Sequence, residues 1–217
     1  MPLLLSRRLT PHTALAVWQL QEPVGELLQV LPAHMDAAAV QQAHPKRQRE
    51  WLASRILVYE LLQQFTPQPL PLQRDQNGKP YFDAPDLHVS ITHSPHLAAV
   101  VLSDRYEVGI DIELVSPKAL RVADKFLTEE EKQYTGGDEQ LTCLYWSAKE
   151  TLYKMYSRRQ LVFKENLFVS PAEAPNVLQG RVQMESFLKL YQIYHDTIEN
   201  HVLTYSIDDT TNFHEES

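Results

Sequence analysis

Two long segments with helical patterns, one in each half of the chain, restrict the possible folds of this sequence more than any other feature. The run over residues 139–156 contains neither Gly nor Pro, and the run over residues 44–62 has apolar side chains at helical spacing. Short alternating segments, typical of strands, accompany each helix. The pattern predicts an α+β fold of two similar lobes, each a mostly antiparallel sheet packed on a long helix, with a cleft between the lobes.

The predicted elements divide the chain into two lobes and a tail. We expect the first lobe over residues 1–106, the second over residues 107–207 and a polar tail over residues 208–217. No linker is long enough to make the lobes independent, and two lobes in one chain favour a monomer. In the second lobe we predict a helix at 119–127 and strands at 161–163, 167–170, 180–185, 187–194 and 201–207.

Composition and charge exclude several classes of protein. The formal net charge of −8 opposes a general nucleic-acid binder, which needs a broad basic face. No apolar run reaches the roughly 20 residues that cross a bilayer, and the first residues lack the order of a secretory signal. The one cysteine, Cys143, excludes an internal disulfide and a thiolate metal cluster. We therefore expect a cytoplasmic protein that binds neither nucleic acid nor membrane.

Residues 107–113 (EVGIDIE) alternate between apolar and polar types, as a strand with two different faces does. The polar face has Gly109, Asp111 and Glu113, and alternate residues of a strand lie about 6.6 Å apart. Two such carboxylates repel each other unless a proton or a cation lies between them, and Mg²⁺ prefers oxygen ligands. Gly109 is expected to leave space for a ligand beside the backbone. A half-buried strand with an acidic solvent face is the alternative.

Cations crowd the start of the helix predicted over residues 44–62, where they oppose the helix dipole. They are Lys46, Arg47 and Arg49, with Arg55 two turns after Arg47. A bound anion would offset that cost, since guanidinium groups match phosphate oxygens. Arg74 and Lys79 flank an Asn77-Gly78 turn between two short strands and could reach an anion on the same side. A solvated basic helix end is the alternative.

The helix over residues 139–156 has a polar stripe. Trp146, Glu150 and Lys154 are four residues apart and therefore lie on one side of the helix. Glu150 and Lys154 alone would also suit an ordinary surface ion pair. His93 comes near the end of an alternating strand over residues 87–94, where a structural role is the alternative.

Three segments, in this order, resemble the 4′-phosphopantetheinyl transferases of the surfactin type, which have two lobes in one chain. Residues 77–80 (NGKP) followed by 89–94 (VSITHS) are similar to the first-lobe signature of that family. Residues 108–113 (VGIDIE) resemble its acidic metal motif. Residues 146–154 (WSAKETLYK) resemble its W-x-x-K-E-x-x-x-K helix. The two long motifs together make the resemblance specific.

The resemblance implies a reaction and a role for each matching residue. Such enzymes move the phosphopantetheine arm of coenzyme A to a serine of an acyl or peptidyl carrier protein and release 3′,5′-ADP. By the match, Mg²⁺ on the coenzyme A pyrophosphate would be held by Asp111, Glu113 and Glu150. Glu150 would also be the base for the serine hydroxyl, and Lys154 would neutralise charge on the phosphoryl group. The phosphates of coenzyme A would be bound by Arg47, Arg55, Arg74 and His93, the last at the 3′-phosphate.

Some positions depart from the family pattern or stay open. Thr151 stands where Ala or Ser is commoner, and residues 155–160 replace glycines that often follow the lysine. A contact between Lys79 and coenzyme A is left open. Carrier proteins are usually acidic, as this chain is, so any attraction must be local. Our hypothesis for the docking surface is the helix predicted over residues 119–127, with Arg121 and Lys125.

Two other functions remain as alternatives. A catalytically silent relative would bind carrier protein or coenzyme A without turnover, although a mere binder needs no set of three acids. An unrelated Mg²⁺-dependent phosphatase would need no arginines opposite its acids.

Overall fold

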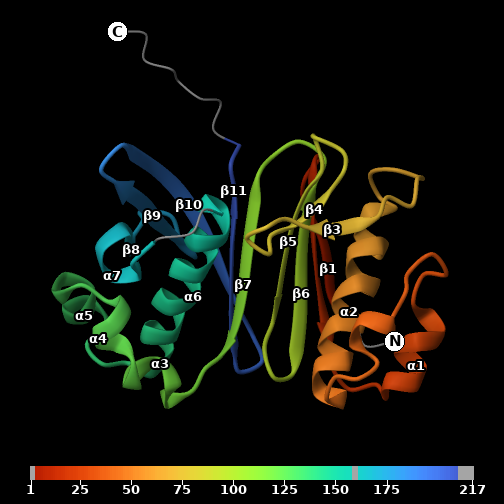
Figure 1. Cartoon of the computed structure of the whole chain (residues 1–217). Coiled ribbons are helices and arrows are strands. Elements are labelled where there is room, and N and C mark those ends of the chain that lie inside the picture. Colours follow the sequence, from red (N-terminus) through yellow and green to blue (C-terminus); the bar gives the residue numbers. More distant parts are fainter. Residues whose placement is uncertain (1–2, 158–160, 210–217) are drawn as a thin grey trace, which may run out of the picture.

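The computed structural model describes residues 3–157 and 161–209 and has four layers, a helix, two sheets and a helix (Figure 1). The sheets face each other in the middle, and one long helix covers the outer face of each sheet. Both sheets are antiparallel throughout. The predicted α+β class with antiparallel sheets is confirmed.

The first half of the chain forms a four-stranded sheet in the order β1-β2-β6-β5. Its strands are β1 (Leu3–Thr10), β2 (Thr13–Gln19), β5 (His88–His93) and β6 (Leu97–Ser103). Around it lie α1 (Val24–Val30), the 3₁₀ helix η1 (Ala38–Val40), α2 (Pro45–Leu62) and a separate hairpin of β3 (Leu72–Arg74) and β4 (Pro80–Phe82). The helix α2 packs on the sheet through Leu52 and Ile56, against Ala16 and Val100.

The second half forms a five-stranded sheet in the order β7-β11-β10-β9-β8. Its strands are β7 (Val108–Leu114), β8 (Leu167–Pro171), β9 (Val177–Met184), β10 (Phe187–Ile198) and β11 (His201–Ile207). The helices are α3 (Pro117–Arg121), α4 (Ala123–Phe126), α5 (Glu129–Thr135), α6 (Glu139–Tyr156) and α7 (Phe163–Asn166). The bounds of α6 match the predicted helix, because Asp138 caps its start and Ser157 ends it in the left-handed conformation.

Two predicted elements of the second half are wrong. The helix expected over residues 119–127 is interrupted at Val122, whose φ of −116° and ψ of 9° are not helical, so that α3 and α4 are separate short helices. The strand expected over residues 161–163 is absent from the described part of the chain, and Phe163 instead begins α7. The Phe163 ring stacks on Trp146 of α6 at a centroid distance of 5.6 Å, and this tertiary contact competes with sheet pairing.

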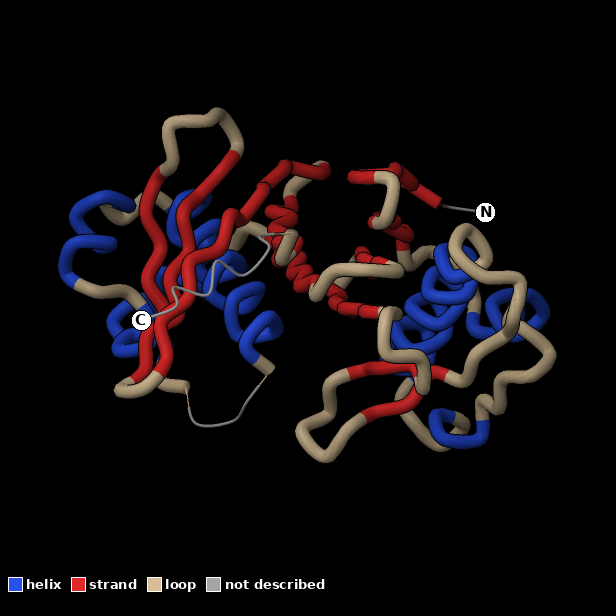
Figure 2. Tube along the Cα trace, turned by 90° about the horizontal axis from the view of Figure 1, so that it is seen from above, coloured by secondary structure: helices blue, strands red, loops and turns tan. Residues whose placement is uncertain are grey.

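The two sheets bury one set of apolar side chains between them, which we call the shared core. From β7 it receives Val108, Ile110 and Ile112, which lie against Val17 and Val101 of the first sheet. The predicted alternation of this strand is confirmed, since its other face turns to α6 and has Gly109, Asp111 and Glu113. Seen from above, the two halves lie side by side and meet along these strands (Figure 2).

β7 lies at the edge of its sheet and meets β5 of the other half. The backbone N–H groups of Ile110 and Ile112 donate to the hydroxyls of Ser90 (3.2 Å) and Thr92 (3.4 Å). Side chains of β5 thus satisfy donors that an edge strand would leave unpaired. We call this contact between β5 and β7 the seam.

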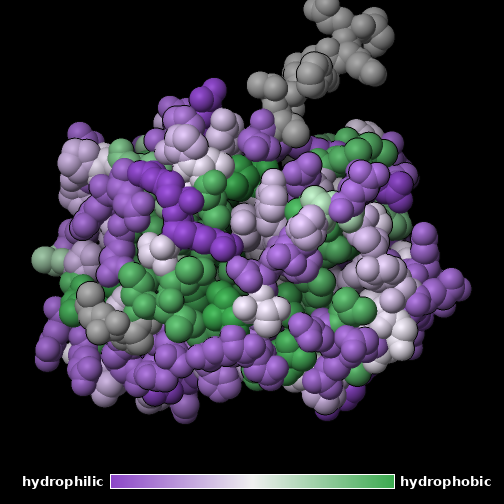
Figure 3. All heavy atoms as spheres, turned by 180° about the vertical axis from the view of Figure 1, so that it is seen from behind, coloured by the Kyte–Doolittle hydropathy of each residue, from purple (hydrophilic) through white to green (hydrophobic). Residues whose placement is uncertain are grey.

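The outer surface mixes polar and apolar areas. The face opposite to that of Figure 1 has an apolar area on the half that contains β1 (Figure 3). In the described ranges, no helix combines the length and apolar character needed to span a bilayer. Of the predicted polar tail, residues 210–217 lie outside the described residues, while Asp208 forms an ion pair with Lys189.

Candidate active site

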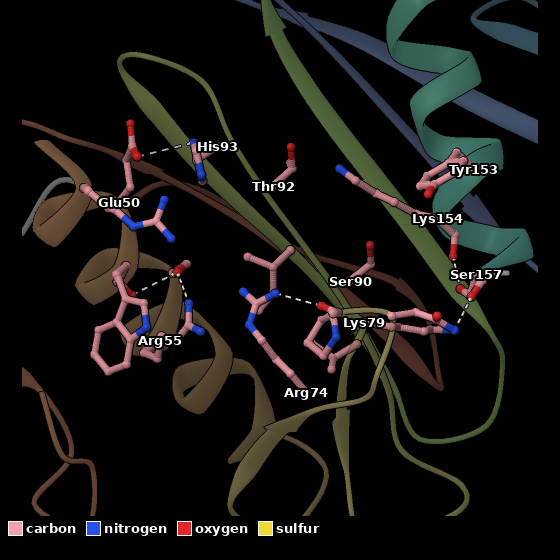
Figure 4. A pocket seen from close by; sticks show the side chains of 18 residues that line it. Glu50, Arg55, Arg74, Lys79, Ser90, Thr92, His93, Tyr153, Lys154 and Ser157 are labelled. Carbon is pink, nitrogen blue, oxygen red and sulfur yellow. Dashed lines mark hydrogen bonds and ion pairs between the residues drawn. The ribbon is translucent and has the colours of Figure 1, made fainter. Parts of the chain in front are cut away.

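A cavity of about 410 Å³ opens at the seam between the two halves. It is lined by residues of α2, the β3–β4 hairpin, β5 and α6. Figure 4 shows Arg55 on one side, Lys154 on the other and Arg74 between them. Five of the predicted site residues line this cavity: Arg47, Arg55, Arg74, His93 and Lys154. The three predicted acids are not among its lining residues.

Arg55 is a buried cation that has no acidic partner among the residues that the structure describes. Arg55 is only 7% exposed. Its guanidinium group lies 4.5 Å from the centre of the Trp51 ring, and its Nη1 donates to Ser54 Oγ at 3.0 Å. No carboxylate of the described residues comes within ion-pair distance of it. Burial, and secondarily the charge of Arg74, lower the pKa of Arg55 to about 10. Glu50 also lines this cavity, but among the described residues neither Arg55 nor Arg74 forms an ion pair with an acid. A bound anion would stabilise two such cations.

The histidine of the cavity is held near a carboxylate. His93 Nδ1 lies 3.7 Å from Glu50 Oε2, and the Glu50 side chain is itself mostly buried. Burial lowers the pKa of His93, and the charge of Glu50 opposes that shift. Arg47 is exposed on the first turn of α2, and Arg74 donates to the carbonyl oxygen of Gly78 at 2.7 Å.

Asp111 connects β7 to both β5 and α6. Its Oδ1 accepts from Lys154 Nζ (2.8 Å) and from Thr92 Oγ1 (3.0 Å), while Lys154 also donates to the carbonyl oxygen of Ile110 (2.8 Å). The residue is 4% exposed, and its Oδ2 is buried without a hydrogen-bond partner among the described residues. A buried carboxylate oxygen without a donor is costly, and a cation would satisfy it.

Glu113 is held by the indole of Trp146. Trp146 Nε1 donates to Glu113 Oε1 at 2.9 Å. The indole ring is fixed by Phe126, edge-on at 5.0 Å, and by Phe163, stacked at 5.6 Å. Burial, and then the charge of Asp111, raise the pKa of Glu113. The stripe predicted on α6 therefore faces the acidic strand at two points, Trp146 and Lys154.

Glu150, like Glu113, is an acid that is largely removed from solvent. Burial, and then the charge of Asp111, raise the pKa of Glu150 to about 7. Across the described residues, no three side chains of the types His, Cys, Asp and Glu are gathered closely enough to hold a metal ion. The acids nevertheless repel one another, and the unpartnered oxygen of Asp111 adjoins them. These features fit a hard divalent cation with oxygen ligands.

The expectation that Gly109 leaves room for a ligand is wrong. A Cβ atom on this residue would lie 2.9 Å from the carbonyl oxygen of Thr151 and 2.9 Å from Met155 Sδ, because α6 packs directly on it. Gly109 thus admits the helix rather than a ligand. The close approach brings Lys154 within hydrogen-bond distance of Asp111. The hydroxyl of Thr151, a departure from the family pattern, bonds to Thr204 Oγ1 at 2.7 Å.

Sequence reasoning missed several residues at this site. Ser90, Thr92 and Glu50 line the cavity, and Thr92 contacts Asp111 directly. A signal existed for two of them, because Ser90 and Thr92 are alternate residues of a predicted strand and must share a face. Nothing in the sequence pairs Glu50 with His93, since they are distant in the chain.

Two family models match most of the chain. The 4′-phosphopantetheinyl transferase N-terminal domain matches residues 35–103, and the 4′-phosphopantetheinyl transferase superfamily model matches residues 107–206. The chain belongs to the 4′-phosphopantetheinyl transferase superfamily. The resemblance noted from three short motifs is therefore confirmed over both halves of this transferase-family chain.

Curated members of the superfamily are similar to it. The 4′-phosphopantetheinyl transferase AcpT of Salmonella typhimurium strain LT2 is 30% identical over 136 residues, which are 60% of this chain and 65% of that protein. AcpT of Escherichia coli strain K12 is 37% identical over 120 residues, 51% of this chain and 58% of that protein. The matches thus span less than two thirds of these relatives. The 4′-phosphopantetheinyl transferase ffp of Bacillus subtilis is 25% identical over 189 residues, 80% of this chain and 82% of that protein.

Proposed function

We propose that this protein transfers the 4′-phosphopantetheine arm of coenzyme A to a serine of an acyl or peptidyl carrier protein, with Mg²⁺, and releases 3′,5′-ADP. Family membership supports the class of reaction, and the names of the relatives state the transferred group. We also propose that the boundary between the two lobes follows residue 106. This is supported by the strand order, since β6 belongs to the first sheet and β7 to the second. A monomeric state and a cytoplasmic location stay predictions.

The observation that most supports this proposal is a cationic cavity that adjoins a buried acidic strand. Coenzyme A has three phosphate groups, and the buried guanidinium of Arg55 has no carboxylate among the described residues to neutralise it. We assign the coenzyme A phosphates to Arg47, Arg55, Arg74 and His93. Lys154 lines the same cavity and contacts Asp111, so it joins the phosphate side to the acidic side.

The proposed chemistry is a phosphoryl transfer. The serine oxygen of the carrier forms a bond to the phosphorus that bears the pantetheine, the pyrophosphate P–O bond breaks, and 3′,5′-ADP leaves with the bond electrons. Glu150 accepts the serine proton, as a carboxylate beside the reacting groups can. Lys154 donates to the phosphoryl oxygens where negative charge grows. Positioning and charge neutralisation thus do most of the work.

Asp111, Glu113 and Glu150 are the residues that would hold Mg²⁺. When bound, the ion neutralises charge on the pyrophosphate and stabilises the leaving oxygen. Trp146 keeps the Glu113 carboxylate in place, and Thr92 does the same for Asp111.

One assay tests the proposal. The protein is incubated with coenzyme A, Mg²⁺ and an apo carrier protein, and the carrier is weighed by mass spectrometry. We expect a gain of the phosphopantetheine mass and its loss in Glu150→Gln and Asp111→Ala, which should keep their circular dichroism spectra. No gain with several carriers would favour a silent binder or a phosphatase. Full activity in either variant would overturn the site assignment.

We further propose that the carrier docks on the surface over α3 and α4. A second cavity, of about 400 Å³, lies there beside Glu113, with Phe126 and Trp146 in its lining and Lys118 and Lys125 among the residues around it. We expect the double variant Arg121→Glu/Lys125→Glu to bind carrier about tenfold more weakly and coenzyme A as well as before. Unchanged affinity for carrier would rule this surface out.

A further inference from the structure

The loop between β3 and β4 belongs to the first half of the chain but is attached to the second. Asn77 Nδ2 donates to the carbonyl oxygen of Ser157, the residue that ends α6, at 3.5 Å. Lys79 Nζ donates to Glu107 Oε2 at 2.8 Å, directly before β7. Figures 1 and 2 both show the loop reaching from its own half toward the other. The contacts of Asn77 and Lys79 therefore cross the seam.

The hairpin is too small to hold its tip by itself. Its strands have three residues each, and an isolated two-stranded hairpin is at best marginally stable in water. The base is anchored, because Phe82 is buried and the Tyr59 hydroxyl accepts from the N–H of Leu72 at 3.1 Å. At the tip, Asp75 Oδ1 accepts from the N–H groups of Asn77 and Lys79, both at 2.8 Å. These last bonds shape the loop but do not fix its position.

The tip has to stay in place against a repulsion. Arg74 donates to Gly78 within the loop and lines the cavity together with Arg55. The charge of Arg74 is one of the causes that lower the pKa of Arg55, after burial, so the two guanidinium groups repel each other. Without a bound anion, this repulsion favours movement of Arg74 and its loop away from α2.

Glu107 is built to hold Lys79. Its Oε2 receives Lys79, its Oε1 lies 3.3 Å from His88 Nδ1, and its backbone oxygen accepts from the N–H of Asp208 at 2.9 Å. His88 of β5 thus orients the carboxylate, and the bond from Asp208 holds the backbone of Glu107. The Lys79 ammonium is directed to this carboxylate, although its side chain lines the cavity.

We propose that Lys79 is a positioning residue, whose ion pair with Glu107 latches the β3–β4 loop across the seam and holds Arg74 in the cavity. The consequence for coenzyme A rests on the proposed function, whereas the latch itself does not. This proposal gives a role to the lysine of the NGKP segment, for which the motif implied none.

The test compares Lys79→Met, Glu107→Gln, the double variant and the reversed pair Lys79→Glu/Glu107→Lys. Affinity for coenzyme A is measured by calorimetry with EDTA at low salt and pH 8, where histidine is largely neutral. We expect each single variant to bind about three- to fivefold more weakly. The double variant should bind no more weakly than either single one, and the reversed pair should recover to within about twofold of the wild type. Lys132→Met, which breaks two remote ion pairs, with Asp124 of α4 and Glu129 of α5, is the matched control and should bind normally.

A direct contact between Lys79 and coenzyme A would give a different result. Lys79→Met alone would then weaken binding, Glu107→Gln would not, and the reversed pair would stay weak; that pattern would overturn the latch. Hydrogen exchange of residues 75–79 is the second readout, which we expect to be faster in both single variants at an unchanged melting temperature. Unchanged exchange would also overturn the proposal. Should the wild type fail to bind coenzyme A, the proposed function fails, while hydrogen exchange still decides the latch.

Discussion

At the scale of single residues, the site depends on charges that the fold holds without their usual partners. Within the part of the chain that the structure describes, Arg55 is buried without an ion-pair partner, and one oxygen of Asp111 is buried without a hydrogen-bond donor. Such groups reduce stability and are retained where a ligand supplies the missing partner.

Arg55→Met should separate binding from folding. We expect affinity for coenzyme A to fall at least tenfold, since a hydrogen bond to a charged group is worth about 1.5–3 kcal/mol. The free energy of unfolding should change by less than about 1 kcal/mol, because relief of the repulsion from Arg74 offsets the lost contact with Trp51. Calorimetric titration and urea unfolding measure the two effects.

Arg49→Met is the control for this variant. It removes the same charge from α2 but from a residue outside the cavity lining, so binding should stay within about twofold of the wild type. An Arg55→Met protein that binds as tightly as the wild type would contradict our assignment of the buried cation.

Glu107 should make stability depend on pH in the acidic range. The hydrogen bond from His88, followed by that from Lys79, lowers the pKa of Glu107 from its ordinary value of 4.5 to about 2. A lowered carboxylate pKa stabilises the fold above the unfolded value, and this contribution is lost as the pH falls from about 4.5 toward about 2. Since the side chain is 44% exposed, solvent screening limits the effect to about 1 kcal/mol.

The measurement is urea unfolding of the wild type and of Glu107→Gln at several pH values. We expect the wild type to be more stable by about 1 kcal/mol at pH 7 and this advantage to shrink between pH 5 and pH 3. An advantage that stays constant over that range would exclude Glu107 as its source.

At the scale of elements, the contact between α6 and β7 sets the site. The helix lies so close to Gly109 that the side chain of Lys154 reaches Asp111, and the Trp146 indole reaches Glu113. Local propensity explains the helix and the strand separately, but only their packing brings the two motifs together.

Gly109→Ala should therefore damage both fold and activity. The added methyl group meets the backbone oxygen of Thr151, which cannot move without shifting α6, and we expect a loss of about 1–3 kcal/mol in the free energy of unfolding. Gly25→Ala in α1 is the matched control, since nothing lies within 4 Å of its added Cβ and alanine favours a helix. Equal stability of the two variants in urea would contradict the close packing of α6.

At the scale of the whole molecule, the shared core ties the two halves into one folding unit. Ile110 is fully buried between the sheets, so Ile110→Ala should cost about 2–5 kcal/mol and lower the melting temperature by about 5–15 °C. Differential scanning calorimetry should show one unfolding transition in both the wild type and Ile110→Ala. The control is Leu188→Ala, at a residue that is 63% exposed, which should leave the melting temperature unchanged. Two separate transitions would show that the halves unfold independently.

The sequence alone was sufficient to predict the features that depend on residues close together in the chain. The absence of Gly and Pro marked α6 to its last residue, and apolar spacing indicated α2. Alternation assigned the two faces of β7, and three motifs indicated the family. It failed at Val122, where the backbone leaves the helical conformation, and at Phe163, whose stacking on Trp146 outweighs a weak local preference.

Only the tertiary structure decided which groups share a cavity and which are left unpaired. The burial of Arg55, the ion pair of Lys79 with Glu107 and the close packing of α6 on Gly109 each depend on elements that are distant in sequence. The physical reason is that periodicity and caps act over one or two turns, whereas burial, ion pairing and close packing depend on how whole elements meet in space.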